Sequence, residues 1–96
     1  MLKAKAVLMN SLDNTATVVD LVEPSTDIIL EINGRRVKVH VTERIPFGHK
    51  FAIYDISKGA QIVKYGEKIG IATQDIRAGQ HVHIHNLESG RGRGDR

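Results

Sequence analysis

Turn-forming residues recur at short intervals along this chain, and their spacing limits what it can fold into. These signals stand at 11–14, 23–25, 33–34 and 46–48, and at Gly59, Gly66, Gly70 and Gly79. The runs between them are short and rich in Val, Ile and Leu, which favours β-strands. No segment shows a sustained apolar period of 3.6, although 48–56 is compatible with one helical turn or a strand. The sequence therefore predicts an all-β domain of many short strands.

The length and composition fit one domain that can fold without disulfides or a structural metal. We place it at 1–88, followed by a flexible Gly- and Arg-rich tail at 89–96. The chain has no cysteine, which excludes disulfides, thiolate metal sites and a cysteine nucleophile. No apolar run approaches the roughly 20 residues that span a bilayer, and residues 1–20 lack a signal-peptide core. We therefore expect a cytoplasmic protein with no membrane partner.

The net charge of +3 gives little reason to expect a nucleic-acid partner. The tail from Arg91 to Arg96 has three Arg and one Asp, so it supplies +2 and leaves +1 for the body. RNA binding through this tail is the least favoured hypothesis, since its Arg-Gly steps lack aromatic neighbours.

The clearest local prediction is a hairpin around Asn33–Gly34, a dipeptide that supplies the two positive φ angles of a type I′ turn. A two-residue loop pairs Ile32 with Arg35 and continues to Asp27 opposite His40. One face is then apolar, and it carries Ile28, Leu30, Val37 and Val39. On this register His40 is a cross-strand partner of Asp27 rather than a ligand.

Two segments repeat each other twenty residues apart. "DISKGAQIVKYG" from Asp55 and "DIRAGQHVHIHN" from Asp75 share Asp, Ile and, after two variable positions, Gly. The Asp can accept hydrogen bonds from nearby backbone, and the Gly can adopt a φ that a side chain disfavours. The repeat predicts two related corners of one compact fold.

Three histidines alternate in "HVHIHN", residues 81–86. On a strand His81, His83 and His85 would project from one face, with about 7 Å between Cα atoms two residues apart. An adjacent pair could ligate one metal, whereas all three could not without a bend, so further ligands would come from elsewhere. A solvated histidine face without a ligand is the equal alternative.

"FGHK" at 47–50 is the second candidate site. His49 can titrate near neutral pH and Lys50 can hold a carboxylate, which suits proton transfer beside an anionic substrate. An ordinary surface loop with two basic side chains is the alternative. Tyr65–Gly66 is interpreted as a turn at the domain edge.

Residues 46–89 closely resemble the amino-terminal SAF-type domain of the altronate and galactarate dehydratase family. The matching elements are Gly48-His49-Lys50, Gly59, Lys64-Tyr65-Gly66, Ile69-Gly70, Ala72-Thr73, Asp75-Ile76, Gly79 and Val82-His83-x-His85-Asn86. The resemblance implies a small β-clip fold. It also implies metal-dependent lyases that remove water from sugar acids, with relatives that eliminate sulfite from sulfolactate.

The same resemblance implies roles for individual residues. His49, His83 and His85 would be catalytic, His83 and His85 would form part of a site for a divalent metal such as iron, and Lys50 would bind substrate. His81 lies outside the motif.

The dehydratases carry a large catalytic domain after this module, whereas this sequence ends at Arg96. We therefore expect the small subunit of a split enzyme, inactive alone, whose large subunit completes the site for a sugar-acid or sulfolactate-type substrate. Homo-oligomer formation stays open. The alternative is a non-enzymatic SAF-like module that binds sugar acids or a protein partner.

Overall fold

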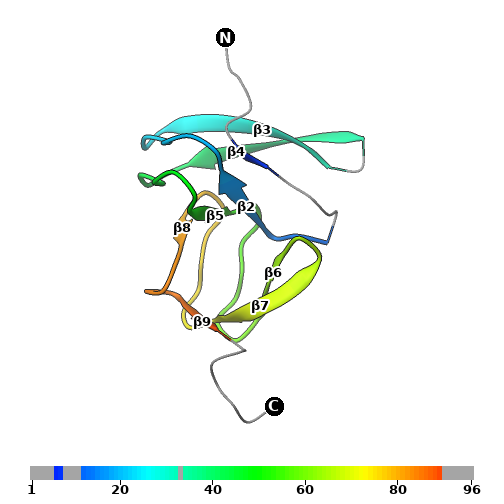
Figure 1. The fold of residues 1–96 in the computed structure, drawn as a ribbon, viewed down its shortest axis with the longest axis vertical. Coiled ribbons are helices and arrows are strands. Elements are labelled where there is room, and N and C mark those ends of the chain that lie inside the picture. Colours follow the sequence, from blue (N-terminus) through cyan, green and yellow to red (C-terminus); the bar gives the residue numbers. More distant parts are fainter. Residues whose placement is uncertain (1–5, 8–11, 33, 90–96) are drawn as a thin grey trace.

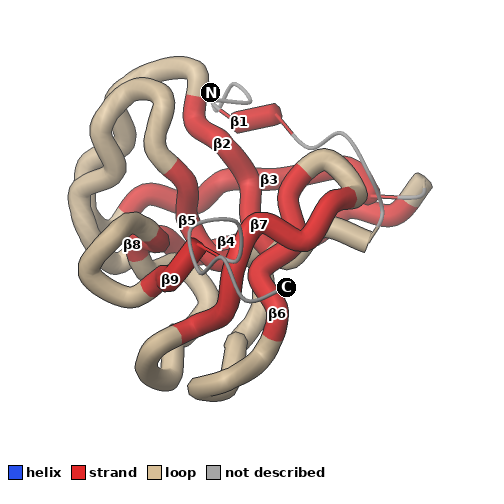
Figure 2. The backbone as a smooth tube through the Cα atoms, turned by 60° about the horizontal axis from the view of Figure 1, so that its bottom comes forward, coloured by secondary structure: helices blue, strands red, loops and turns tan. Residues whose placement is uncertain are grey.

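The computed structural model describes residues 6–7, 12–32 and 34–89, which form nine short strands and no helix. The strands are β1 (Ala6–Val7), β2 (Thr15–Val18), β3 (Thr26–Ile32), β4 (Arg35–Val41), β5 (Lys50–Ala52), β6 (Gln61–Lys64), β7 (Glu67–Ala72), β8 (His81–Val82) and β9 (Leu87–Ser89). The predicted all-β class is therefore confirmed, and the ambiguous segment 48–56 contains a strand. Turns and loops occupy much of the chain between these strands (Figure 2). No described residue belongs to a helix that could cross a membrane.

Three small antiparallel sheets make up the domain. The four-stranded sheet has the order β1-β2-β5-β8, while β3 pairs with β4 and the third sheet runs β6-β7-β9. Figure 1 shows the β3–β4 hairpin at one end, the β6–β7–β9 sheet at the other, and β2, β5 and β8 between them. The predicted tail 89–96 lies outside the described residues except for Ser89, which ends β9.

The β3–β4 hairpin confirms the predicted register in full. Ile32 pairs with Arg35 and the ladder continues through Asp27 opposite His40. The His40 ring and the Asp27 carboxylate lie 2.6 Å apart, as expected of a cross-strand pair. Asn33 lies outside the described residues, while Gly34 has the positive φ of 77° that such a turn requires.

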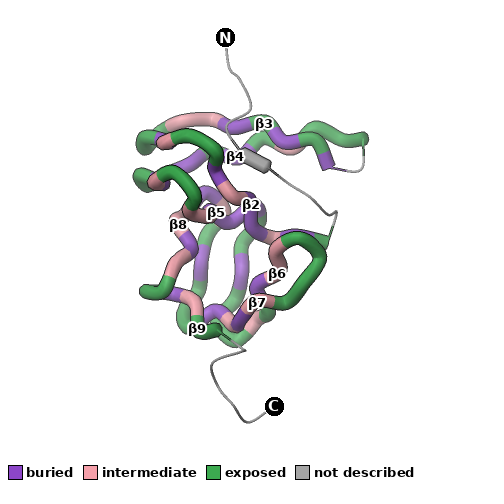
Figure 3. The backbone as a smooth tube through the Cα atoms, viewed as in Figure 1, coloured by how far each residue is buried: buried purple, intermediate pink, exposed green. Residues whose placement is uncertain are grey.

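Two apolar clusters stabilise the domain, and β5 separates them. Phe51 belongs to the first cluster, which includes the buried side chains of β2, β3 and β4, while Ala52 belongs to the second. Successive strand residues point to opposite faces, so this short strand contributes to both clusters. Figure 3 shows buried positions interspersed with less buried ones along the strands, and mainly exposed positions at the outer turns. Because β5 is held from both faces, the residues at its start are firmly placed.

The predicted corners at Asp55 and Asp75 are confirmed, and they pair with each other. Ile56 and Ile76 exchange backbone hydrogen bonds of 2.7 and 2.8 Å. The Asp55 carboxylate accepts from the Ala78 N–H and the Asp75 carboxylate accepts from the Lys58 N–H, both at 2.9 Å. Each carboxylate thus accepts a hydrogen bond from the backbone of the other segment. Because the two sets of contacts are equivalent, the segments are related by a local twofold arrangement.

A second pair of corners follows the same plan without the aspartates. Val22 and Ile45 exchange hydrogen bonds of 3.0 and 2.8 Å, and the positive-φ position three residues later is Ser25 in one copy and Gly48 in the other. Sequence comparison missed this pair because neither copy has Asp and one lacks Gly. His49 directly follows such a corner, so its position is fixed by backbone pairing rather than by a loop.

Removing one of the capping carboxylates is expected to cost about 1 kcal/mol of unfolding free energy, the typical net contribution of one hydrogen bond. Asp75→Ala and Asp55→Ala should show similar losses in the urea midpoint because their contacts are equivalent. Asp20→Ala is the matched control, since its carboxylate bonds to the adjacent Leu21 N–H. An equal loss for Asp20→Ala would contradict a stabilising role for bonds across the corner.

The β6–β7 hairpin turns at Tyr65–Gly66, as predicted. Both residues have positive φ, 56° and 77°, and Tyr65 is 45% exposed at the domain edge. The buried Asp13 carboxylate accepts from the Gly66 N–H at 2.7 Å, which fixes the turn against the start of β2. The turn therefore holds the end of β6, including Lys64, in a defined place.

Candidate metal centre

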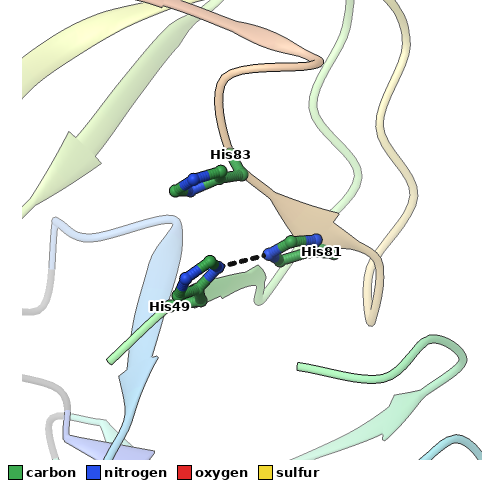
Figure 4. Close-up of side chains that lie close together, drawn as sticks. All are labelled: His49, His81 and His83. Atoms are coloured by element: carbon green, nitrogen blue, oxygen red, sulfur yellow. Dashed lines mark hydrogen bonds between the residues drawn. The ribbon is translucent and has the colours of Figure 1, made fainter. Parts of the chain in front are cut away.

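Two neighbouring strands bring three histidines together. His49 precedes β5, His81 begins β8, and His83 follows the end of β8. In the antiparallel β5–β8 pair Phe51 stands opposite His81. Continuing this register by two residues places His49 opposite His83, so side chains from both strands converge. Figure 4 shows the three rings close to one another.

The rings of this histidine cluster (His49, His81 and His83) are close enough to share an ion. One nitrogen from each ring lies within 4.8 Å of the others. His49 Nδ1 and His81 Nε2 are 2.9 Å apart, and the His49 and His83 ring centroids are 4.2 Å apart with an interplanar angle of 19°. All three residues are partly buried. Such spacing is compatible with one small cation between the nitrogens.

The expectation of a strand through residue 85 is wrong, because β8 ends at Val82. The side chain of Asn86, only 4% exposed, ends it: its Oδ1 accepts from the His83 N–H and its Nδ2 donates to the His81 carbonyl, at 3.0 and 2.8 Å. The chain therefore turns over 83–86. This bend changes which histidines meet.

His81, which the sequence motif left out, is in the cluster, whereas His85 is not among the three. His85 is exposed, and its ring centroid is 5.3 Å from that of His81 at an angle of 37°. The catalytic and ligand roles given to His49, His83 and His85 remain predictions. A signal for the turn was present in the sequence, since Asn three residues after His83 can bond the local backbone.

The donor set suits a divalent transition metal. Three imidazole nitrogens are typical ligands of zinc, iron and related ions, and three protein ligands leave positions open for other groups. The cluster could therefore hold a metal.

Burial and the neighbouring charges favour the neutral form of His81 and His83. Partial burial lowers the pKa of His81 below 6.5, and the neighbouring His49, His85 and His83 lower it further, while Glu43 opposes the shift. Burial also lowers the pKa of His83, with His49 and Lys50 adding to the effect. A neutral ring offers a nitrogen lone pair to a metal at pH 7.

These shifts predict that the metal-free domain loses stability in mild acid. The unfolded chain binds protons at His81 and His83 near pH 6.5, whereas the folded chain binds them only at lower pH, so stability should fall as pH drops below about 6.5. Urea midpoints between pH 7.5 and 5.5 measure this slope. Replacing both residues by glutamine should flatten it, and an unchanged slope would contradict the assignment.

The Asp27 carboxyl does not contribute to the predicted loss of stability between pH 7.5 and 5.5. Its hydrogen bond to His40 is the main cause that lowers its pKa from 3.8, so any stability it contributes is lost only in stronger acid.

Lys50, the predicted substrate-binding residue, begins β5 next to His49 and is half-buried. It pairs with Val82 of β8. Its ammonium is near enough to His83 to lower the pKa of that ring.

The fold and the cluster define a small all-β domain with a histidine site built across two paired strands. The chain matches the altronate/galactarate dehydratase SAF domain over residues 4–90, and it belongs to this family. The resemblance in the sequence is thus confirmed.

Curated relatives include both dehydratases and sulfo-lyase subunits. Altronate dehydratase of Escherichia coli (strain K12) is 42% identical over 84 residues, which is 86% of this chain and 16% of that protein. The (2R)-sulfolactate sulfo-lyase subunit alpha of Chromohalobacter salexigens is 42% identical over 57 residues, 59% of this chain and 61% of the relative. The subunit alpha of Paracoccus pantotrophus is 43% identical over 47 residues, 49% of this chain and 70% of the relative. The chain thus spans a small part of the dehydratase and under two thirds of the first of these subunits.

Proposed function

We propose that this chain is the small subunit of a lyase that acts on sugar acids or on sulfolactate, and that its histidine cluster completes an active site on a larger partner. The observation that carries the proposal is the convergence of His49, His81 and His83. The relatives named subunit alpha support a partner chain, since such a name implies a second subunit.

The reaction is an elimination. A base takes a proton from the carbon next to a carboxylate, and the electron pair of that C–H bond forms a C=C bond. The adjacent carbon loses either sulfite, which takes the C–S electron pair, or its hydroxyl, which gains a proton from an acid and leaves as water. A divalent metal at the cluster would supply Lewis-acid assistance when bound. The partner would contribute the remaining ligands.

We assign different roles to the histidines of this chain. The three rings of the cluster would hold the ion, because one nitrogen of each lies within 4.8 Å of the others. His85 is exposed beside His81, and we assign to it the exchange of a proton with the substrate. This division keeps the predicted catalytic role of His85 and adds His81 as a ligand.

Purification of the tagged chain from its native cells, followed by assay of the complex, tests the proposal. We expect release of water from altronate or galactarate, or of sulfite from sulfolactate, and loss of this activity in His49→Ala and His83→Ala complexes. His40→Ala is the control, since this ring lies on β4 and pairs with Asp27. Full activity of both variants would overturn the catalytic proposal. A chain that binds sugar acids alone, with no activity in any complex, would instead identify the non-enzymatic module.

A further inference from the structure

Lys50 and Lys64 are two lysines that form no ion pair with a carboxylate of the described residues. Lys50 is half-buried at the start of β5, and Lys64 is partly buried at the end of β6. The described ion pairs within 4.0 Å involve Lys38, His40 and Arg44 instead. Glu67 stands opposite Lys64 in the hairpin register, but it forms no such pair. Two unpaired cations at a partly buried place attract an anion.

The sheet gives Lys50 a fixed position with a polar neighbour. Thr17 of β2 and Val82 of β8 stand directly opposite Lys50 on either side, so the three side chains share one face of the sheet. The Thr17 hydroxyl is buried and has no hydrogen-bond partner. A buried hydroxyl without a partner is uncommon in folded proteins, and it marks a place where a polar group can be accommodated.

Hydrogen bonds between β2 and β6 bring Lys64 to the same face. The Thr15 hydroxyl donates to the Val63 carbonyl at 3.1 Å, and the Asn14 side-chain oxygen accepts from the Val63 N–H at 2.8 Å. Burial lowers the pKa of Lys50, and the positive charge of Lys64 lowers it further. The two lysines therefore interact electrostatically. The Lys64 Nζ also lies 5.0 Å from the centre of the Tyr65 ring, which limits where it can move.

We propose that Lys50 and Lys64, with the Thr17 hydroxyl opposite Lys50 in the sheet, form an oxyanion site that takes the carboxylate or sulfonate of the substrate beside the histidine cluster. Ammonium groups bind such oxygens by charge-assisted hydrogen bonds. Lys50 adjoins His49 in the chain, and its charge contributes to the lowered pKa of His83, so an anion held there lies at the edge of the histidine cluster. This inference rests on the proposed function for the identity of the ligand, and it adds Lys64 and Thr17 to the residues that contact it.

NMR titration of the whole metal-free chain with sodium sulfate and, separately, sodium lactate tests the site at constant ionic strength set with sodium chloride. We expect saturable shifts of the Lys50 and Lys64 side-chain signals for at least one of the two anions. Lys50→Met and Lys64→Met should each weaken binding about tenfold, the loss expected for one charge-assisted hydrogen bond. Lys38→Met is the matched control, because Lys38 is an exposed lysine near Asp27 on the distant hairpin. A response to lactate alone assigns a carboxylate, and a response to sulfate alone assigns a sulfonate.

Shifts that do not exceed those in chloride would overturn the inference, as would binding that survives in both lysine variants. Lys64→Met changes a residue at the hairpin end, so it remains informative if Lys50→Met does not fold. Metal binding by the same preparations separates the two proposals. Failed anion binding with intact metal binding removes this site alone, whereas failed metal binding with intact anion binding removes the proposed metal centre alone.

Discussion

Gly79→Ala is expected to destabilise the domain by about 2 to 5 kcal/mol, whereas Gly59→Ala should cost only about 1 to 2 kcal/mol. The two glycines occupy equivalent positions in the paired corners, with φ of 91° and 88°. Both variants therefore bear the same backbone penalty. They differ in the room available for the added methyl group. A Cβ at Gly79 would overlap the His40 carbonyl oxygen of β4, while a Cβ at Gly59 meets nothing within 4 Å.

Urea unfolding at pH 7.5 measures this difference, and Gly59→Ala is the internal control for the φ penalty. The contact at Gly79 also matters for the site, because the Gly79 carbonyl accepts from the Thr42 N–H at 3.0 Å just before His81. Any Gly79→Ala protein that folds should therefore bind metal more weakly than Gly59→Ala. Equal losses of stability in the two variants would show that the close approach to β4 contributes little.

Local chemistry explains which parts of the fold could be predicted. The β3–β4 register follows from a two-residue turn and an alternating pattern, both of which lie within the segment itself. The corners at Asp55 and Asp75 repeat in sequence because each aspartate caps the other copy. The Val22–Ile45 pair was missed because neither segment has the capping Asp and one lacks the Gly, so backbone hydrogen bonds and apolar burial build it without a shared motif.

The geometry of the histidine cluster could be predicted only in part from the sequence. The family motif pointed to His49 and His83, and the structure brings these two rings together. Whether His81 or His85 joins them depends on where β8 ends, and this is decided by the buried side chain of Asn86. An alternating pattern predicts a continuous strand at this place, so the pattern alone gave the wrong geometry for residues 83–85.

Single alanine substitutions in the histidine cluster are expected to abolish tight metal binding by the isolated chain. Losing an outer hydrogen-bond partner of a metal ligand typically weakens affinity roughly 10- to 100-fold, and losing a ligand should cost at least as much. We therefore expect His49→Ala, His81→Ala and His83→Ala each to weaken binding of Co²⁺ by about 100-fold or more. The absorption bands of Co²⁺ and competition with Zn²⁺ measure the affinity.

His85→Ala and His40→Ala decide between the two geometries for this site. The family resemblance makes His83 and His85 the ligand pair, so it requires a large loss in His85→Ala and none in His81→Ala. The turn at Asn86 requires the reverse, because it moves His85 out of the group whose nitrogens lie within 4.8 Å. His40→Ala should leave binding unchanged, since its ring pairs with Asp27 and is not part of the cluster. A large loss in His85→Ala with full binding in His81→Ala would therefore reject the cluster as the metal centre and restore the pair that the sequence motif predicts.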